Sequence, residues 1–151
     1  MDNLNQRIHG SFSFYLDDQL VAIRAFGSWN LECAQEFRKL VEKNTYLYHE
    51  KQYLSLIDLR EWELGTPDAI AFLAEQGGKP QPYDRSIGGL REIELGKPGS
   101  YALKTSEKHI VGQKEGIRYL TSVEGVLEIL DDLGVQYNKD RLRDFLGQQN
   151  E

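Results

Sequence analysis

The sequence has little cysteine, little proline and no long apolar run. A single cysteine, Cys33, cannot form a disulfide within the chain, as is typical of proteins of the reducing cytoplasm. Four prolines and fourteen glycines are too few for a collagen-like or low-complexity chain. No apolar run approaches the roughly 20 residues of a membrane-spanning helix, and the N-terminus lacks the apolar core of a signal peptide. We therefore expect a cytoplasmic protein without a membrane partner.

Positive charge is also scarce. Lys and Arg number 18 against 24 Asp and Glu, which gives a formal net charge of −6 at pH 7. Because nucleic-acid binding needs a basic face, this balance argues against nucleic acid as a partner. What the chain does have is 151 residues, of which 40% are hydrophobic. That length can bury a core without a metal or a disulfide, so we predict a single domain over residues 1–151.

The N-terminal third has the patterns of a hairpin followed by a helix. Apolar and polar residues alternate over Ser11–Leu16 and again over Leu20–Phe26, with a short acidic turn between them. The period then changes to that of a helix over 31–44, and Asn30 is a suitable N-cap. Cys33 lies beside the apolar stripe of this helix, which predicts a buried thiol and not a reactive one.

The middle of the chain predicts a buried strand and a capped helix. Tyr53–Leu59 is nearly continuous in apolar residues, as in a strand covered on both faces. Strand, helix and strand in this order suggest a βαβ crossover. Thr66, Pro67 and Asp68 are a capping residue, a first-turn residue and a residue that complements the helix dipole, and Gly77 ends this helix.

The C-terminal half begins with a stretch whose apolar residues follow no regular pattern. Residues 83–100 show no single period, and we interpret them as a hairpin or a lid-like insertion. Further along we predict short strands, a polar loop, a helix with a capping box and a last helix with an N-cap. These are Tyr101–Leu103 and Ile117–Leu120 (strands), Thr105–Glu115 (loop), Val123–Leu133 with the box Thr121-x-x-Glu124, and Lys139–Leu146 after Asn138.

Together these elements predict the fold class. It is an α/β domain with a mixed sheet of about four to five strands, an N-terminal β-hairpin and about four packed helices.

Motifs for metal, nucleotide or nucleophilic chemistry are missing. His9, His49 and His109 stand far apart, and no spacing typical of zinc ligands occurs. No glycine-rich phosphate loop or nucleophile elbow is present either. We therefore predict no catalytic residue, no metal and no cofactor.

Acidic and aromatic residues near the buried strand invite other interpretations. Asp58 is either a general base or a strand-end carboxylate that accepts backbone N–H bonds, and the second role is the commoner one. Glu61 and Glu63 suggest a solvated turn. Trp29 and Trp62 each stand at the junction of two elements. Each covers an edge of the core or anchors a partner, and we favour the core.

The order of elements resembles a known class of small domains. A hairpin, Gly27-Ser28-Trp29, an amphipathic helix, a strand ending in Asp58-Leu59-Arg60 and a helix capped at Thr66 are similar to the STAS and SpoIIAA-like class. The strand Ile117–Leu120 followed by Thr121-Ser122-Val123-Glu124 is similar to the final strand–helix step of SpoIIAA-like bacterial proteins. The resemblance covers residues 10–133. It implies a shape shared with anti-sigma-factor antagonists and with the lipid-binding Sec14 fold.

The resemblance also implies a function. In the antagonist branch an acidic residue precedes a phosphorylated Ser or Thr at the helix start, whereas Gly65 precedes Thr66 here. We expect a non-enzymatic regulatory domain that binds a protein partner through a surface around Arg60, Trp62, Thr66 and Asp68. The alternative is a small-molecule or lipid carrier with a pocket under residues 83–100. A third hypothesis, a hydrolase pairing Asp58 with a histidine, has no support from residue spacing.

Overall fold

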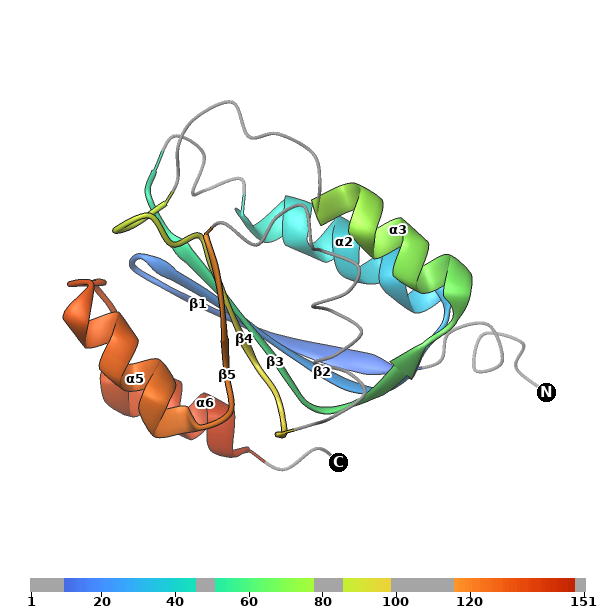
Figure 1. The fold of residues 1–151 in the computed structure, drawn as a ribbon. Coiled ribbons are helices and arrows are strands. Elements are labelled where there is room, and N and C mark those ends of the chain that lie inside the picture. Colours follow the sequence, from blue (N-terminus) through green and yellow to red (C-terminus); the bar gives the residue numbers. More distant parts are fainter. Residues whose placement is uncertain (1–9, 46–50, 78–85, 99–115, 149–151) are drawn as a thin grey trace.

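The computed structural model describes residues 10–45, 51–77, 86–98 and 116–148 (Figure 1). These stretches form five strands and four helices. The strands are β1 (Ser11–Asp17), β2 (Leu20–Trp29), β3 (Leu54–Gly65), β4 (Glu92–Leu95) and β5 (Ile117–Leu120). The helices are α2 (Leu31–Thr45), α3 (Pro67–Gly77), α5 (Val123–Asp132) and α6 (Lys139–Gly147).

The strands form one mixed sheet whose spatial order, β1-β2-β3-β4-β5, is also their order along the chain. β1 pairs antiparallel with β2, from Ser11 opposite Phe26 to Asp17 opposite Leu20. The remaining neighbours pair in parallel. The predicted hairpin and the β2-α2-β3 crossover are both confirmed, and so is the α/β fold class.

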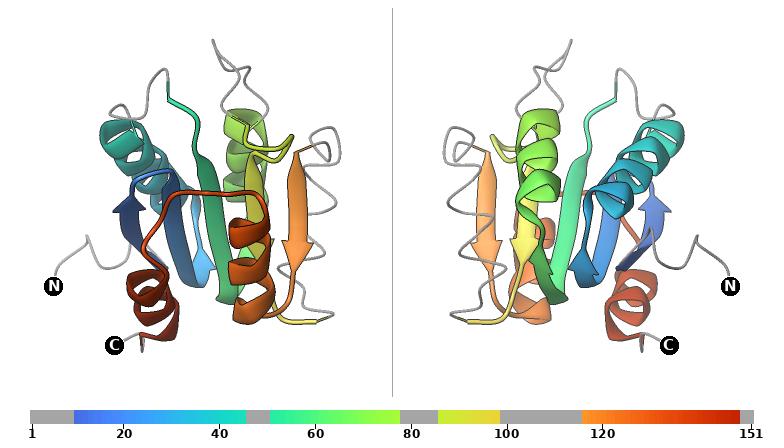
Figure 2. Two further views of the ribbon diagram at one scale, coloured as in Figure 1. Left: turned by 90° about the vertical axis from the view of Figure 1, so that its left-hand side faces the viewer. Right: turned by 90° about the vertical axis from the view of Figure 1, so that its right-hand side faces the viewer.

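Helices cover both faces of the sheet. α2 and α3 lie on one face, and α5 and α6 lie on the other (Figures 1 and 2). A tight turn is enough to join the antiparallel strands β1 and β2. Parallel strands need a longer crossover connection, and the helices in such connections cover the faces of the sheet. No helix in the described part of the chain is long and apolar enough to span a membrane.

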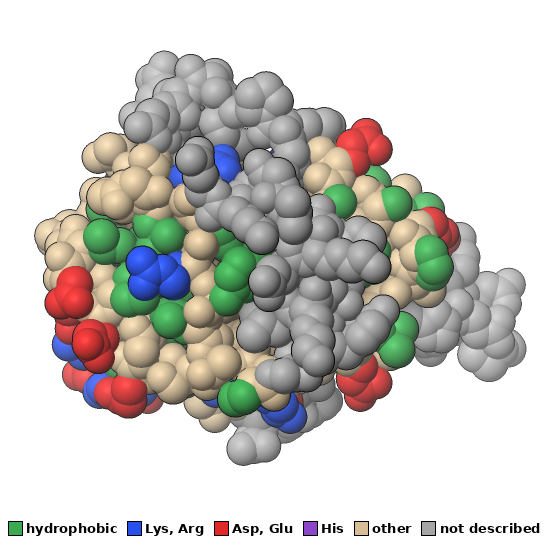
Figure 3. Space-filling view, in the orientation of Figure 1, with side chains coloured by type: hydrophobic (Ala, Val, Ile, Leu, Met, Phe, Trp, Pro, Cys, Tyr) green, Lys and Arg blue, Asp and Glu red, His purple; other side chains and the backbone are tan. Residues whose placement is uncertain are grey.

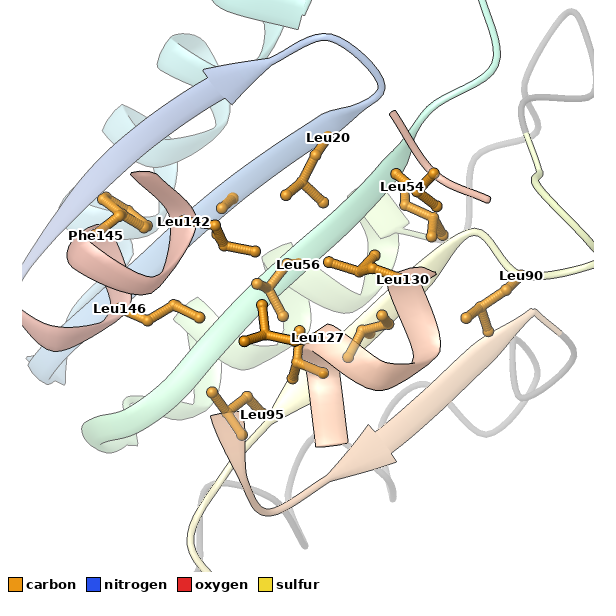
Figure 4. Close-up of a cluster of buried hydrophobic side chains, with 14 residues drawn as sticks. Leu20, Leu54, Leu56, Leu90, Leu95, Leu127, Leu130, Leu142, Phe145 and Leu146 are labelled. Atoms are coloured by element: carbon orange, nitrogen blue, oxygen red, sulfur yellow. The ribbon is translucent and has the colours of Figure 1, made fainter. Parts of the chain in front are cut away.

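The core between the sheet and α5/α6 is built largely of leucine (Figure 4). Alternate residues of the central strands point into it, and the apolar stripes of both helices close it. Its fully buried side chains include Leu54 and Leu56 of β3, Leu130 of α5 and Leu142 of α6.

The core between the sheet and α2/α3 contains more aromatic side chains. Phe12, Trp29 and Phe37 meet in tilted and edge-on pairs, with ring centroids 5.2–5.7 Å apart. Trp62 and the small residues Cys33, Ala34 and Ala69 complete this cluster. Both tryptophans are therefore core residues, as favoured above, with exposed fractions of 3% for Trp29 and 7% for Trp62.

Three of the helices have N-cap residues whose side chains accept a backbone hydrogen bond, and one of these caps lies one residue from the predicted position. Asn30 Oδ1 accepts from Cys33 N at 3.0 Å, and Asn138 Oδ1 accepts from Arg141 N at 3.1 Å, as predicted. The cap of α5 is Ser122, whose Oγ accepts from Gly125 N at 3.0 Å. The predicted box at Thr121 is thus wrong by one residue, since Ser122 also has the extended backbone of an N-cap and directly precedes the helix.

Two of our expectations about strands are wrong. β3 continues to Gly65, so Glu61 and Glu63 lie in a strand and not in a turn. Residues 86–98 do not form a lid, because they make a tight turn at Ile87–Leu90 and then β4, between β3 and β5. Ile93 and Leu95 of this strand are fully buried. The predicted strand Tyr101–Leu103 and loop 105–115 lie outside the described residues.

Candidate functional site

All four residues of the predicted interaction surface lie on β3 or on the helix start that follows it. β4 pairs with β3 only from Ser55 to Asp58, so the later part of β3 is paired with β2 alone among the described strands. The register between β2 and β3 shifts in this later part, between Arg24 and Phe26 and again between Gly27 and Ser28. β3 carries the extra residue each time. It therefore contains bulges, which change the face toward which its side chains point.

The first bulge separates Arg60 from Trp62. In a regular strand residues two apart share a face. Here Arg60 points toward α6, where its Nη2 donates to the carbonyl of Leu146 at 2.6 Å. Trp62 packs in the core under α2 and α3. The two residues therefore do not form one continuous surface.

On the α6 side, Arg60 belongs to a buried cluster of charges around Asp58. Arg24 Nε donates to Asp58 Oδ2 at 3.0 Å. Arg60 donates to the same carboxylate from Nε (2.9 Å to Oδ1), from Nη2 (2.8 Å to Oδ2) and from its backbone N (3.0 Å to Oδ1). Asp58 is 1% exposed and Arg24 5%. One carboxylate thus faces two guanidinium groups deep in the protein.

The end of α6 supplies the remaining acceptors. Arg24 Nη1 donates to the carbonyls of Phe145 (3.3 Å) and Gln148 (2.6 Å). The last carbonyls of a helix have no partner within it and carry partial negative charge, which complements the net positive charge of this cluster. The hydrogen bond to Asp58 raises the pKa of the Arg60 guanidinium, which therefore stays protonated. We call Arg24, Asp58 and Arg60 the arginine clamp.

The arginine clamp engages both carboxylate oxygens of Asp58, which a catalytic base would need. Both carboxylate oxygens accept from guanidinium groups, so neither is available to remove a proton from a substrate. The expected backbone bond is present too, from Arg60 N, although Asp58 lies within β3 and not at its end. His9, His49 and His109 lie outside the described residues.

Cysteine and metal chemistry have little support in the described part of the chain. Cys33 is fully buried, and this burial raises the pKa of its thiol to about 12. A thiol with such a pKa is protonated at neutral pH and is a poor nucleophile. No group of His, Cys, Asp and Glu side chains that could hold a metal ion occurs among the described residues.

Trp62 supports the turn between β3 and α3 from below. A Cβ added to Gly65 would lie 2.8 Å from Ile70 Cδ1 and 3.1 Å from Trp62 Cζ2, so the backbone passes tightly over these side chains. Thr66 N donates to the carbonyl of Trp29 at 2.9 Å. The end of β3 is thereby fixed against both tryptophans.

Thr66 and Asp68 lie together at the start of α3. Thr66 Oγ1 donates to Asp68 Oδ1 at 2.5 Å and accepts a longer bond, 3.4 Å, from Ala69 N. The predicted capping role of Thr66 is confirmed. Asp68 is exposed, and Thr66 is half-buried.

Leu64, which the sequence analysis did not single out, is the most exposed large hydrophobic residue of the described chain, at 45%. Glu61 and Glu63 are also exposed on this part of β3. Glu61 lies 3.7 Å from Lys97 Nζ, and Glu63 accepts from Ser28 Oγ at 3.2 Å. An exposed leucine thus directly follows an acidic residue, Glu63, with Glu61 two positions before that residue. The second bulge lies between Trp62 and Leu64, so it separates two side chains that regular alternation would place on one face.

Charge elsewhere on the molecule is dispersed. In Figure 3 acidic side chains lie at several separate places around one face, over helices as well as strand ends. The excess of acidic residues thus forms no single acidic cluster on this face.

Comparisons with known proteins place the fold. No family model matches the chain, and no curated protein matches it either. Among solved structures, the chain is similar to an uncharacterized protein from the DUF3478 family, with a SpoIIAA-like fold, from Shewanella loihica PV-4. The TM-score is 0.57 and the identity 15%, over 81% of this chain and 95% of the other. The chain therefore has a SpoIIAA-like fold, as the order of its elements predicted.

Proposed function

We propose that this chain is a non-enzymatic regulatory domain of the cytoplasm that binds a protein partner. Its contact surface comprises the exposed end of β3 and the first turn of α3, which we call the β3–α3 surface: Glu61, Glu63, Leu64, Thr66 and Asp68. Trp62 supports this surface from within, whereas Arg60 points toward α6, so neither residue is part of it.

The exposure of Leu64 carries the proposal. Single exposed hydrophobic residues are common on proteins, but this one lies on a strand end that is fixed by two buried tryptophans and a capped helix. Because the backbone here is already fixed, a partner that covers Leu64 has only its side chain to order. Interface residues of this kind carry much of the binding energy.

The acidic neighbours indicate the chemistry of the partner. Glu61, Glu63 and Asp68 surround Leu64 in sequence with negative charge, and the whole chain carries −6. A partner with an apolar pocket and basic residues at its rim would be complementary in charge. The state of Asp58 and Cys33 supports a binding role over a catalytic one, since neither group is available as base or nucleophile.

The proposal is tested by matched substitutions of leucine. Leu64→Ser removes the exposed side chain of the β3–α3 surface, and Leu40→Ser removes a comparably exposed one, 37%, from α2. Tagged full-length variants are used to capture partners from cell lysate, and each captured protein is then purified and its affinity measured. We expect Leu64→Ser to weaken at least one defined interaction by about tenfold, or roughly 1.4 kcal/mol. Leu40→Ser should leave it unchanged.

A charge reversal provides a second arm. Glu63→Lys should weaken the same interaction, whereas Glu128→Lys, at an exposed position of α5, should not. If each substitution on the β3–α3 surface had the same effect as its matched control, the β3–α3 surface would be excluded as the contact surface. Native mass spectrometry that finds a stoichiometric small molecule bound to the purified chain would instead favour the carrier hypothesis.

A further inference from the structure

The two edges of the sheet differ in how they are protected. β5 has four residues and exposes the charge of Arg118. β1 has seven residues, Ser11–Asp17, in unbroken register with β2, and contains no Lys, Arg or Pro. Proteins usually shield an edge strand by shortness, charge, proline or a bulge, because its backbone groups can pair with another strand. Among the described residues, no strand pairs with the outer side of β1.

The hairpin turn determines which backbone groups of β1 point outward. Asp17 pairs with Leu20 across a two-residue turn. The closing pair of such a hairpin exchanges its hydrogen bonds, and successive pairs then alternate between bonded and non-bonded. The N–H and C=O groups that point away from β2 are accordingly those of Leu16, Phe14 and Phe12.

We propose that β1 pairs antiparallel with β1 of a second copy of this chain, about a two-fold axis at Phe14. The outward groups of Phe14 then bond with those of the other Phe14, and the groups of Phe12 bond with those of Leu16. This register uses the same three residues whose backbone groups are directed outward. It joins two five-stranded sheets into one continuous sheet.

The side chains of β1 are complementary to themselves in this arrangement. A two-fold axis perpendicular to the sheet keeps each face continuous across the interface. On the α2 face Phe12 lies beside Leu16 of the other copy, and the two Phe14 rings meet. These three side chains are half-buried in the single chain, so pairing covers their remaining exposed surface.

Charge selects the antiparallel direction. Asp17 is the sole charged residue of β1 and lies at its end. Antiparallel pairing places the two Asp17 carboxylates at opposite ends of the interface, whereas parallel pairing would place them side by side. Neighbouring like charges oppose strand pairing. Phe37 of α2 packs edge-on against Phe12, and Phe145 of α6 stacks on Tyr15, so both helices contact side chains of β1, while its outward backbone groups pair with no described strand.

The first test is the mass of the full-length chain in solution. Light scattering after size exclusion should give twice 17.4 kDa for the wild type at micromolar concentration. Phe14→Pro removes one outward N–H without removing a bond to β2, and Phe14→Ala removes the ring but keeps that N–H. We expect the proline variant to be monomeric and the alanine variant to dimerise more weakly than the wild type. Circular dichroism checks that both are folded.

The second test does not depend on how well those variants fold. In the proposed dimer the two Ser13 residues lie diagonally across the axis, about 7–8 Å apart. A short bismaleimide should therefore link Ser13→Cys chains into covalent dimers, and it should not link the control Asp132→Cys, on α5. The native Cys33 is buried and does not interfere.

Three results would overturn the proposal. They are a monomeric wild type at every concentration, equal dimer stability for the Phe14→Pro and Phe14→Ala variants, and no faster cross-linking of Ser13→Cys than of the control. Open-ended assembly beyond the dimer would also contradict it, because a two-fold interface at β1 is closed.

Discussion

The two faces of the sheet are stabilised differently. Under α2 and α3 the core combines aromatic rings with small residues, and the Trp29 indole donates to backbone carbonyls of Ser11 and Phe26. Glu94 of β4, which is 4% exposed, is in register with Ile57, which packs on this face, so one buried carboxyl group lies here too. Under α5 and α6 a leucine core surrounds the arginine clamp. The comparison teaches that a cluster of paired charges stabilises the α5/α6 layer, whereas packed rings and small side chains make up most of the α2/α3 layer.

The difference has a physical consequence for mutation. Apolar packing tolerates changes that conserve volume, usually at a cost below about 1.5 kcal/mol. A buried ion cluster tolerates the loss of one member poorly, because the remaining charges are left without compensation. The α5/α6 face should therefore be the more sensitive to substitutions that conserve size.

The largest effect is expected for Asp58→Asn. The substitution keeps the size of the side chain but leaves the buried guanidinium group of Arg24 and the partly exposed one of Arg60 without a carboxylate. We expect the free energy of unfolding to fall by about 3–5 kcal/mol, as measured by urea denaturation at pH 7. Asp68→Asn, at the exposed start of α3, is the matched control and should cost about 0.3–1 kcal/mol. Similar losses from both would show that the clamp does not stabilise the α5/α6 face.

The two arginines of the clamp should differ from each other. Arg24→Met removes donors to Asp58 and to two carbonyls of α6 at a site that is 5% exposed. It should cost about 1.5–3 kcal/mol, which is typical of hydrogen bonds to charged groups. The Arg60 side chain is 25% exposed, so water can replace part of its bonding, and Arg60→Met should cost less. Denaturation measured side by side would refute this ranking if Arg60→Met proved the more destabilising.

Helix caps should contribute to stability on both faces of the sheet. Ser122→Ala removes the cap of α5, and Thr66→Ala removes that of α3. Each should cost about 1 kcal/mol, with the smaller loss for Thr66, whose bond to Ala69 N is longer. Thr121→Ala is the control for the first, because an exposed residue outside the cap should change stability by less than about 0.5 kcal/mol. A loss at Thr121 equal to that at Ser122 would restore the cap that the sequence suggested.

The smallest expected effect is on the pH dependence of stability through Asp131. The Lys139 side chain and the Tyr137 hydroxyl both hydrogen-bond to Asp131, which joins α5 to the start of α6 and lowers the pKa of its carboxyl. A lowered pKa in the folded state adds stability above the unfolded pKa, and this stability is lost as pH falls through the folded value. Asp131→Asn should therefore slightly reduce the urea midpoint at pH 7 and have less effect near pH 3. An equal reduction at both pH values would contradict an electrostatic role.

The sequence predicted most of the fold because its signals are local. The alternation in β1 and β2, the caps at Asn30 and Asn138 and the stripe of α5 each reflect contacts within a few residues. β4 is missed although Glu92–Leu95 alternates, because the apolar residues of the whole stretch 83–100 around it show no single period. Its two buried leucine-core residues, Ile93 and Leu95, depend on neighbours that are far away in the chain.

The candidate site was predicted less well, for a related reason. Thr66 and Asp68 were found because a capped helix start is a local pattern. Arg60 and Trp62 are predicted to lie together because both stand between the end of the buried strand and the helix start at Thr66, and the bulge in β3 separates them. The bulge, the exposure of Leu64 and the link from Arg24 to the end of α6 are all long-range features, which no short window of sequence contains.

The arginine clamp also bears on the order in which the chain can reach its final state. Each strand pairs with its neighbour in sequence, so the sheet can grow from the N-terminus while synthesis proceeds. Arg24, however, finds its carbonyl acceptors 121 and 124 residues later. A nascent chain that has completed β2 and β3 therefore holds Arg24 and Arg60 with Asp58 but without their carbonyl acceptors, which do not yet exist. Docking of α6 is the step that completes their coordination, so final stability should appear only after that helix has left the ribosome.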